Sequence, residues 1–462
     1  KNERIQKLNG FKFEKVGDNL NQFYKNSLPF ELTGDQKKVI KEIRNDFRDG
    51  KQMNRLLQGD VGSGKTIVSI MIMLIAIDNN FQSCILAPTE ILANQHFKSI
   101  KELLSGLDIK IDLLTGSVKT KDRKVIHEDL LSGKTNILVG THAILEDIVK
   151  FKSLGLSIVD EQHRFGVAQR AKLWKKNSPP PHVLVMTATP IPRTLAMSLY
   201  GDLDISSIKE LPPGRITTKT VHKYDKNRLS VFKFLREQIK KGRQIYLVYP
   251  LINESEKLDY KDLMDGYESI VREFPRPDFQ VSIVHGKMSS KDKDYEMGRF
   301  INKETQILVS TTVIEVGVNV PNASVMVIES AERFGLSQLH QLRGRVGRGN
   351  EESYCILMTK DNLSEDSKIR VDTMVKVSDG FKLAEVDLKL RGPGDMMGTK
   401  QSGALKFKLA DIIYDSEILN NARKCAYKLL ESDPRLTKKE NYPIRHEISS
   451  SSNSKNLWRY IS

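Results

Sequence analysis

The sequence is poor in cysteine and has no long hydrophobic run. Its three cysteines, Cys84, Cys355 and Cys425, are far apart and form neither a disulfide framework nor a zinc motif. We therefore expect a cytoplasmic protein in a reducing compartment, without a structural metal. The most apolar run, Ile67 to Ile77, is too short to span a bilayer, so we expect neither a membrane span nor a signal peptide.

The sequence also has fewer acidic residues than basic ones. Lys and Arg number 73 against 58 Asp and Glu, which gives a net charge of +15 at pH 7. Such a balance favours a polyanionic partner, most often nucleic acid, because basic side chains neutralise phosphates and release counterions. A basic surface that serves only solubility is the alternative that charge alone leaves open.

Short apolar runs alternate with helical stretches over residues 28–210, which is typical of a doubly wound parallel sheet. The expected strands are Arg55–Gln58, Ser83–Ala87, Ile111–Leu114, Ile137–Gly140, Leu156–Asp160 and Val183–Thr187. The breaker cluster Leu211-Pro212-Pro213-Gly214 predicts a linker, after which the pattern restarts. The second set of expected strands is Ile245–Tyr249, Val281–Val284, Ile307–Ser310, Val325–Ile328 and Tyr354–Met358. The predicted fold class is therefore α/β, with two parallel-sheet lobes.

These patterns divide the chain into four parts. Residues 1–27 read as a helical linker, residues 28–211 as the first lobe and residues 212–375 as the second lobe. Residues 376–462 read as a helical region with a glycine-rich loop at Arg391–Gly403 and a helix around Ile412–Leu430. The serine-rich segment near Ser449–Ser454 predicts a mobile tail.

Residues Gly59 to Thr66 match the phosphate-loop pattern G-x-x-x-x-G-K-[ST] between an expected strand and an expected helix. Glycines at 59, 62 and 64 allow the backbone N–H groups to surround a phosphate, and the helix N-terminus adds a positive field. Lys65 can then reach the β- and γ-phosphates, while the Thr66 hydroxyl can hold Mg²⁺. The segment predicts a binding site for a nucleoside triphosphate.

Two acidic residues follow the expected strand Leu156–Asp160. A carboxylate at such a strand end, in the lobe that carries a phosphate loop, is where Mg²⁺ is held, which assigns Asp160 as a metal ligand. The neighbouring Glu161 is then placed to orient and deprotonate the attacking water. His163 reads either as a residue that couples hydrolysis to movement or as an ordinary turn histidine.

Three arginines separated by glycines occur in Gln341–Gly349. If the second lobe folds over the nucleotide, Arg345 and Arg348 can neutralise the charge that develops on the γ-phosphate. A basic loop on nucleic-acid phosphates is the alternative. Arg343 is left without an assigned role.

Together, Gly59–Thr66, Asp160–His163, Met186–Pro190 and Gln341–Gly349 resemble the ordered motifs of superfamily 2 helicases. More narrowly, the chain resembles the RecG branch. The stretches that carry this resemblance are Asp160–Gly166, Thr187–Thr194, Thr311–Ala323 and Leu339–Arg345. The resemblance extends from Leu28 to about Leu430. It implies two RecA-like lobes with a C-terminal extension, and an ATP-dependent DNA translocase that remodels stalled forks and branched recombination intermediates.

The resemblance also implies roles for individual residues. It assigns Phe30 and Gln36 to adenine recognition, Glu315, Gly317 and Gln341 to nucleotide contact, Thr187 and Thr189 to the link between hydrolysis and lobe movement, and Arg391 and Gln401 to a translocation motif that passes lobe closure to the duplex. Asn319 stands where an Asp is common, which weakens the expectation of ribose recognition there. The chain starts at Lys1 without an initiator Met, and residues 1–27 resemble only the linker that follows the family's N-terminal wedge domain. We therefore expect the motor portion without the wedge.

The implied cofactors are ATP and Mg²⁺. The implied partners are double-stranded and branched DNA and a single-strand DNA-binding protein, with the chain itself a monomer. The motor of a transcription-repair coupling factor, which shares the Gln401 region, is an alternative within the same class. A nucleic-acid-binding scaffold with little motor activity is an alternative from another class, although intact Lys65, Asp160 and Glu161 argue against it. An RNA helicase is a further alternative, without an RNA module to support it.

Overall fold

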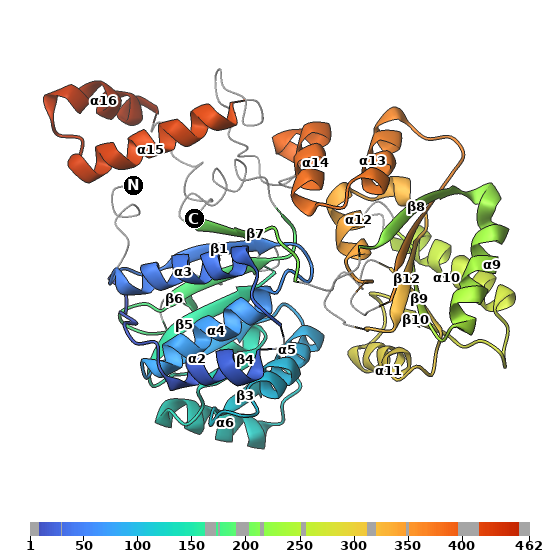
Figure 1. Cartoon of the computed structure of the whole chain (residues 1–462), viewed down its shortest axis with the longest axis horizontal. Coiled ribbons are helices and arrows are strands. Elements are labelled where there is room, and N and C mark those ends of the chain that lie inside the picture. The colour runs from blue at the N-terminus through green and yellow to red at the C-terminus, as the bar shows by residue number, and fades with distance from the viewer. Residues whose placement is uncertain are drawn as a thin grey trace.

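The chain forms two parallel β-sheets in two lobes, each covered by helices on both faces (Figure 1). The computed structural model describes residues 9–28, 30–161, 172–173, 176–190, 203–212, 217–250, 256–311, 320–347, 351–395 and 415–451. All strand pairings within both sheets are parallel over these residues. The predicted α/β class with two parallel-sheet lobes is confirmed.

Lobe 1 contains a seven-stranded sheet in the order β3-β4-β2-β5-β6-β1-β7. Its strands are β1 Asn54–Gly59, β2 Gln82–Leu86, β3 Ile111–Leu114, β4 Ile137–Gly140, β5 Leu154–Asp160, β6 His182–Thr187 and β7 Asp204–Ile208. Its helices are α2 Asp18–Gln22, α3 Gly34–Arg48, α4 Lys65–Asp78, α5 Glu90–Leu103 and α6 Thr120–Ser132, with short helical turns at Phe23–Ser27 and His142–Leu145.

Side-chain alternation along the strands divides the core of lobe 1 between two faces. Ile85 and Leu57 pack with α2, α3, α4 and α5 on one face. Their neighbours Cys84 and Leu86 pack with Leu130 of α6 on the other face. Because both faces are covered, the strands are almost entirely buried, as parallel sheets require. The carboxyl ends of β1, β5 and β6 therefore lie side by side at one edge of the lobe.

Lobe 2 contains a six-stranded sheet in the order β10-β11-β9-β12-β13-β8. Its strands are β8 Lys219–Tyr224, β9 Gln244–Val248, β10 Val281–Val284, β11 Ile307–Ser310, β12 Ala323–Ile328 and β13 Tyr354–Thr359. Its helices are α9 Arg228–Lys240, α10 Glu256–Glu273, α11 Ser290–Ile301, α12 Leu336–Arg343, α13 Glu365–Lys376 and α14 Gly380–Asp395, with short turns at Asp225–Asn227 and Ala331–Arg333. Helices α9 and α10 pack on one face, and α11 to α14 pack on the other.

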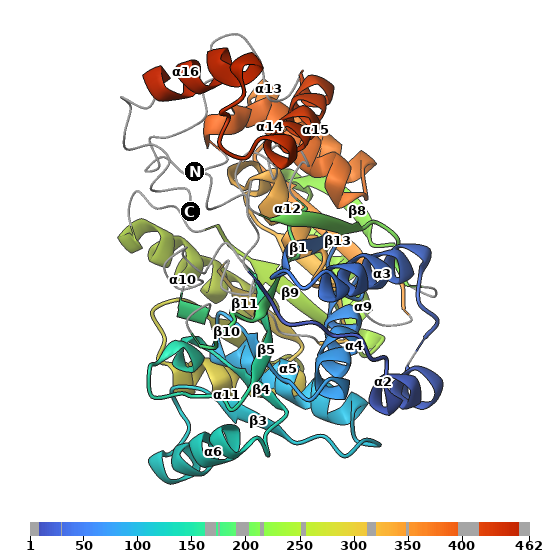
Figure 2. The same cartoon turned by 90° about the vertical axis from the view of Figure 1, so that its left-hand side faces the viewer.

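The helices α15 Ser416–Ser432 and α16 Tyr442–Ser451, joined by a turn at Lys439–Asn441, follow lobe 2 in the chain. Both helices lie together at the upper edge of the molecule in two perpendicular views (Figure 1, Figure 2). Ser449 to Ser451, which the sequence places in a mobile tail, form the end of α16. The rest of that serine-rich segment lies outside the described residues.

The structure differs from the sequence-based expectation at one edge of each sheet and at the N-terminus. Strands β7 and β8 are edge strands that pair with β1 and β13, and their polar sequences give little strand signal. Residues 9–17 form no helix, and Phe13 and Phe23 are buried in the core of lobe 1. Residues 9–27 are therefore an integral part of lobe 1 rather than a linker before it.

His182, at the start of β6, holds the N-terminal segment and β1 together. Its Nδ1 accepts a hydrogen bond from the Met53 N–H at 2.9 Å, and its Nε2 donates to the Phe11 carbonyl at 2.9 Å. The rings of Phe13 and Phe47 pack against the imidazole. Burial lowers the pKa of His182 from 6.5 to about 4, because the charged form is poorly solvated there.

We expect acid to destabilise lobe 1 through His182. A histidine with a lowered folded-state pKa contributes full stability above pH 6.5 and loses it as the pH falls towards 4. The expected loss of unfolding free energy between about pH 7.5 and about pH 5 is about 2 kcal/mol, measured from urea denaturation curves. The matched variant His182→Gln cannot take up a proton and should show a correspondingly flatter pH profile. Identical profiles for both proteins would contradict this prediction.

Candidate nucleotide-binding site

The phosphate loop follows β1 and ends at the first turn of α4. Gly62 and Gly64 have φ angles of +79° and +82°, which place them in the left-handed region that favours glycine. A Cβ at Gly64 would collide with Gln36 Nε2. The Lys65 Nζ donates to the carbonyls of Gly59 and Asp60, at 2.7 and 2.9 Å. The loop thus has the backbone shape of a phosphate cradle, with its lysine held inside the loop.

The segment before α3 supports this loop. Thr33 caps α3 and forms a capping box with Gln36. The Gln36 Oε1 accepts from the Thr33 N–H at 3.0 Å, and its Nε2 donates to the Ser63 carbonyl at 2.8 Å. Phe30 lies next to Gly64. Gln36 is fully buried, so in this structure its amide links the upstream segment to the phosphate loop; adenine recognition by Phe30 and Gln36 stays a prediction.

Asp160 ends β5 at the same edge of the sheet. Its Oδ2 lies 2.8 Å from His96 Nε2 of α5, and its Oδ1 accepts from the Glu161 N–H at 3.1 Å. Burial by itself raises the pKa of Asp160, but the hydrogen bond and charge of His96, with the charge of Lys65, outweigh it and lower the pKa below its usual value. Asp160 is therefore ionised at neutral pH, which suits a ligand for a hard cation. His96, which no sequence motif marks, is a further residue of the site.

Glu161 lies in a strained backbone conformation with φ +54°, which is uncommon for a residue with a side chain and is often found at functional sites. Burial and the neighbouring Asp160 raise the pKa of Glu161, while Lys65 and Arg345 oppose that shift. A hydrogen bond from the Ala188 backbone also stabilises the carboxylate. A carboxylate with a raised pKa is suited to accept a proton near neutral pH.

The turn after β6 borders this carboxylate. The hydroxyls of Thr187 and Thr189 lie 2.9 Å apart, and the Thr189 N–H donates to Thr187 Oγ1 at 3.2 Å. Ala188 between them supplies the backbone group that contacts Glu161. The structure therefore places the two threonines beside the acidic pair; their role in coupling stays a prediction.

Lobe 2 contributes α12 and the residues after it. Arg345 is buried and close enough to Glu161 for its charge to lower the Glu161 pKa. A Cβ at Gly344 would lie 2.8 Å from Cβ of Val61 in the phosphate loop, so the two lobes are in close contact here. Gln341 is also buried on α12. The charge of Lys65 acts on Asp160 and Glu161, and that of Arg345 acts on Glu161; the catalytic roles of these four residues stay predictions.

Arg343, which the sequence left without a role, is a buried structural residue. Its Nη1 donates to the carbonyls of Met374 and Val377, and its Nη2 donates to the Ser378 carbonyl and to His340 Nδ1 at 2.9 Å. These bonds tie α12 to the connection between α13 and α14. Burial lowers the pKa of Arg343, and the carbonyl oxygens solvate the guanidinium group in place of water.

Several predicted residues lie outside the described part of the chain. They are His163, Glu315, Gly317, Asn319, Arg348 and Gln401. Arg391 lies in the last turns of α14. For these residues the assigned roles stay predictions.

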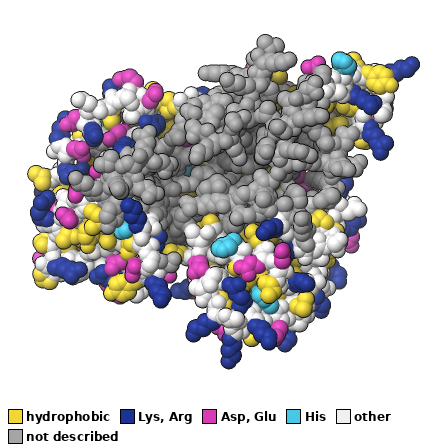
Figure 3. Space-filling view, turned by 180° about the vertical axis from the view of Figure 1, so that it is seen from behind, with side chains coloured by type: hydrophobic (Ala, Val, Ile, Leu, Met, Phe, Trp, Pro, Cys, Tyr) yellow, Lys and Arg dark blue, Asp and Glu magenta, His cyan; other side chains and the backbone are white. Residues whose placement is uncertain are grey.

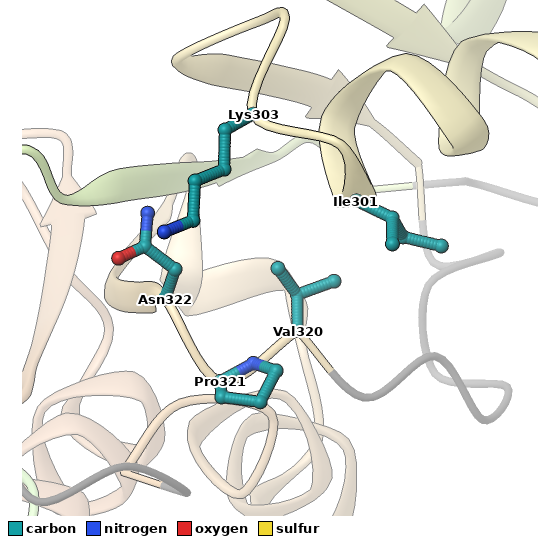
Figure 4. A pocket seen from close by; sticks show the side chains of 5 residues that line it. All are labelled: Ile301, Lys303, Val320, Pro321 and Asn322. Carbon is teal, nitrogen blue, oxygen red and sulfur yellow. The ribbon is translucent and has the colours of Figure 1, made fainter.

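A pocket of about 330 Å³ lies in lobe 2, lined by Ile301, Lys303, Val320, Pro321 and Asn322 (Figure 4). The side chains of Lys303 and Asn322 point towards one another there. None of the residues of the phosphate loop or the acidic pair lines this pocket, so it is separate from the candidate site. On the face opposite Figure 1, Lys and Arg side chains are spread over the described surface with Asp and Glu between them (Figure 3).

No helix within the described residues is long and apolar enough to cross a membrane.

Three family models match the chain in sequence order. The DEAD/DEAH box helicase model matches residues 33–198, and the helicase conserved C-terminal domain matches residues 230–350. The C-terminal model of domain 3 of the ATP-dependent DNA helicase RecG matches residues 377–462. The three matches correspond to lobe 1, most of lobe 2, and the region from the start of α14 onwards.

Proteins named ATP-dependent DNA helicase RecG are similar to the chain over most of its length. The Synechocystis protein is 48% identical over 94% of the chain and 52% of its own length. The Aquifex aeolicus protein is 51% identical over 88% of the chain and 52% of its own length, and the Bacillus subtilis protein is 50% identical over 91% and 61%. The chain therefore spans about half to three fifths of the length of these curated relatives.

A solved structure of RecG bound to a three-way DNA junction is similar to the chain with a TM-score of 0.74 and 43% identity, over 89% of the chain and 53% of that protein. The helicase MrfA, in a DNA-bound crystal structure, shares the fold at 18% identity and a TM-score of 0.59. Because identity of 48 to 51% extends over 88 to 94% of the chain in three relatives, and all three family models match in order, this chain belongs to the RecG family of helicases.

Proposed function

We propose that this chain is an ATP-driven motor that moves along double-stranded DNA and remodels branched DNA, such as stalled forks and Holliday junctions, in repair and recombination. The observation that carries the proposal is one site built from both lobes. The site combines Lys65, Asp160 and Glu161 of lobe 1 with Arg345 of lobe 2, whose charge acts on Glu161. A site divided between two RecA-like lobes can convert nucleotide binding and release into lobe movement.

ATP fits the cradle, because the glycine-rich loop and the start of α4 present N–H groups and Lys65 supplies a cation. On ATP binding, Lys65 would exchange its two carbonyl partners for phosphate oxygens. Asp160 and Thr66 would hold Mg²⁺. Mg²⁺ is usually held by one or two protein ligands together with phosphates and water, and these two side chains would supply the protein ligands. When bound, Mg²⁺ would neutralise charge on the phosphates.

Glu161 would orient and deprotonate the attacking water, and Arg345 would stabilise charge on the transferred phosphoryl group. Thr187 and Thr189 flank Ala188, whose backbone contacts Glu161. They would therefore respond to hydrolysis of the nucleotide. The segment beyond α14, with Arg391 and Gln401, would pass lobe movement to the duplex. The match to RecG domain 3 over residues 377–462 supports this assignment over the motor of a transcription-repair coupling factor.

DNA as the partner is supported by the net charge of +15 and by the RecG structure with a three-way DNA junction. We further propose a monomer in the cytoplasm, with a single-strand DNA-binding protein as a partner. The buried free thiols of Cys84 and Cys355 suit a reducing compartment.

The proposal predicts that DNA stimulates ATP hydrolysis by this chain. Steady-state hydrolysis would be measured without nucleic acid, with linear duplex, with a three-way junction of equal length in nucleotides and with RNA. We expect stimulation by DNA but not by RNA, and greater stimulation by the junction. If about six phosphates are contacted, the apparent DNA affinity should fall by roughly 10³ between roughly 50 and roughly 200 mM salt.

Three outcomes would count against the proposal. Equal rates with and without DNA would contradict a DNA-driven motor. Stimulation by RNA to the same level would favour an RNA helicase instead. Salt-independent stimulation would argue against binding through the phosphates, because surface charges are screened within about 10 Å at about 0.1 M salt.

A further inference from the structure

Asp60 occupies an unusual place for a carboxylate. It lies inside the phosphate loop, where an added negative charge disfavours the binding of a polyphosphate. The structure shows what stabilises it: Oδ1 accepts a hydrogen bond from His340 Nε2 of α12, and Oδ2 accepts from the Gly380 N–H at 3.2 Å. Both partners belong to lobe 2, and Gly380 is the first residue of α14. A residue of the phosphate loop thus holds two elements of the other lobe.

The orientation of His340 is fixed by Arg343. The guanidinium group donates to His340 Nδ1, so that nitrogen is the acceptor. Nε2 is therefore the protonated ring nitrogen, and it donates the hydrogen bond to Asp60. Arg343 is in turn held by three backbone carbonyls, one in the last turn of α13 and two in the segment between α13 and α14. A continuous path of hydrogen bonds therefore runs from the phosphate loop through α12 to the start of α14.

The start of α14 is fitted closely to lobe 1. A Cβ at Gly380 would lie 2.7 Å from Asp60 Oδ1 and closer still to His340 Nε2, so only glycine leaves room for these contacts. The adjacent Phe381 ring lies under Lys209 of lobe 1, with Nζ 5.6 Å from the ring centroid. The Asp60 carboxylate also faces the positive end of the α14 dipole, which favours the contact.

From these contacts we propose that Asp60 is a positioning residue that fastens the start of α14 to the phosphate loop, and that ATP binding at the loop weakens this contact. The inference rests on the proposed function, because it requires that the loop binds ATP. Lys65 donates to the Asp60 carbonyl in this structure and would leave it for the phosphates. The arriving phosphates add negative charge beside the Asp60 carboxylate, while Lys65, a nearby positive charge, turns away. Both changes weaken the contact of Asp60 with lobe 2.

The charge and burial of Asp60 support a contact that ATP binding weakens. Burial raises the pKa of Asp60, but the hydrogen bond from His340, the Gly380 N–H and the Lys65 charge together lower it below its usual value. The carboxylate is therefore ionised in this arrangement, and part of its stabilisation comes from the lysine that ATP would draw away. Because coupling between two binding events is reciprocal, a contact that ATP weakens must itself weaken ATP binding.

The test measures hydrogen exchange at the start of α14, residues 380–383, with and without the slowly hydrolysed analogue ATPγS and Mg²⁺. In the unaltered chain we expect the analogue to raise exchange there by about fivefold, the factor for one lost hydrogen bond. In Asp60→Ala, exchange should be high already and unaffected by the analogue, and ATPγS should bind about fivefold more tightly. His340→Asn, whose shorter side chain cannot reach Asp60, should give the same result from the other lobe.

Asp379→Ala is the matched control. Asp379 Oδ1 accepts from the Phe381 and Lys382 N–H groups, so its removal loosens the same helix turn without changing the phosphate loop. This variant should show higher exchange overall but keep its response to ATPγS. If the unaltered chain binds ATPγS and α14 does not respond, or if both Asp60→Ala and His340→Asn keep the response, the positioning role is overturned. If the unaltered chain does not bind ATPγS at all, the proposed function is overturned with it.

Discussion

Replacing Glu161 with Gln should leave ATP binding nearly unchanged and lower its turnover by a factor of about 10²–10⁴, the usual contribution of a general base. The substitution keeps the size and shape of the side chain but removes its ability to accept a proton. It also keeps the strained backbone at φ +54°, since Gln and Glu meet the same steric limits there. ATP turnover at saturating DNA and binding of a fluorescent ATP analogue measure the two effects separately.

The expectation depends on what surrounds Glu161. Burial and the adjacent Asp160 raise its pKa, and Arg345 and Lys65 are close enough to oppose that shift. Removing the Glu161 charge should therefore lower the electrostatic free energy needed to keep Asp160 ionised. Mg²⁺ and ATP should then bind at least as well as before. A variant with weak ATP binding would show that Glu161 builds the site rather than acting as the base.

Glu102→Gln serves as the matched control for this prediction. Glu102 is exposed on α5 of the same lobe, so the same chemical change there should leave turnover within error of the unaltered protein. Turnover of Glu161→Gln within a factor of two of that control would exclude Glu161 as the base.

The sequence predicted the parts of the fold that local patterns encode. Strands β3, β4, β10 and β11 have the predicted bounds, because each is a short, mostly apolar run; β4 and β11 are buried throughout, β10 nearly so and β3 only in part. The phosphate loop was predicted for a different reason: its glycines and Lys65 occupy fixed positions relative to one strand and one helix. Strand β8 was missed because its residues alternate between exposed and half-buried along a sheet edge, which leaves a weak hydrophobic signal.

The contacts between lobes could not be predicted from local patterns. Asp60 lies at a position that the phosphate-loop pattern leaves free, and its partner His340 is 280 residues further along the chain. His96 appears in sequence as one polar residue of a helix, and only the order of β2, β5 and α5 in space brings it to Asp160. Both contacts join residues that are distant in the chain, and only the fold brings them together, between the lobes for Asp60 and within lobe 1 for His96.

Arg343 and Arg345 have different roles although only Gly344 separates them in the chain. The sequence predicts that Arg345 acts on the γ-phosphate and assigns no role to Arg343, two residues before it. The structure separates them: Arg343 donates to three backbone carbonyls and to His340, whereas the charge of Arg345 acts on Glu161 in the other lobe. We therefore expect Arg345→Ala to affect ATP turnover and Arg343→Ala to affect stability.

Arg345→Ala should lower DNA-stimulated ATP turnover by a factor of about 10³–10⁵, as expected when an arginine that stabilises the phosphoryl-transfer transition state is removed. Its midpoint of thermal unfolding should change little, because the loss is felt only when charge develops on the phosphate. Arg343→Ala should instead lower that midpoint, since Met374, Val377 and Ser378 carbonyls would lose a buried donor. If Arg345→Ala kept its turnover while unfolding earlier, Arg345 would be a packing residue, and the positive charge for the transition state would have to come from another side chain.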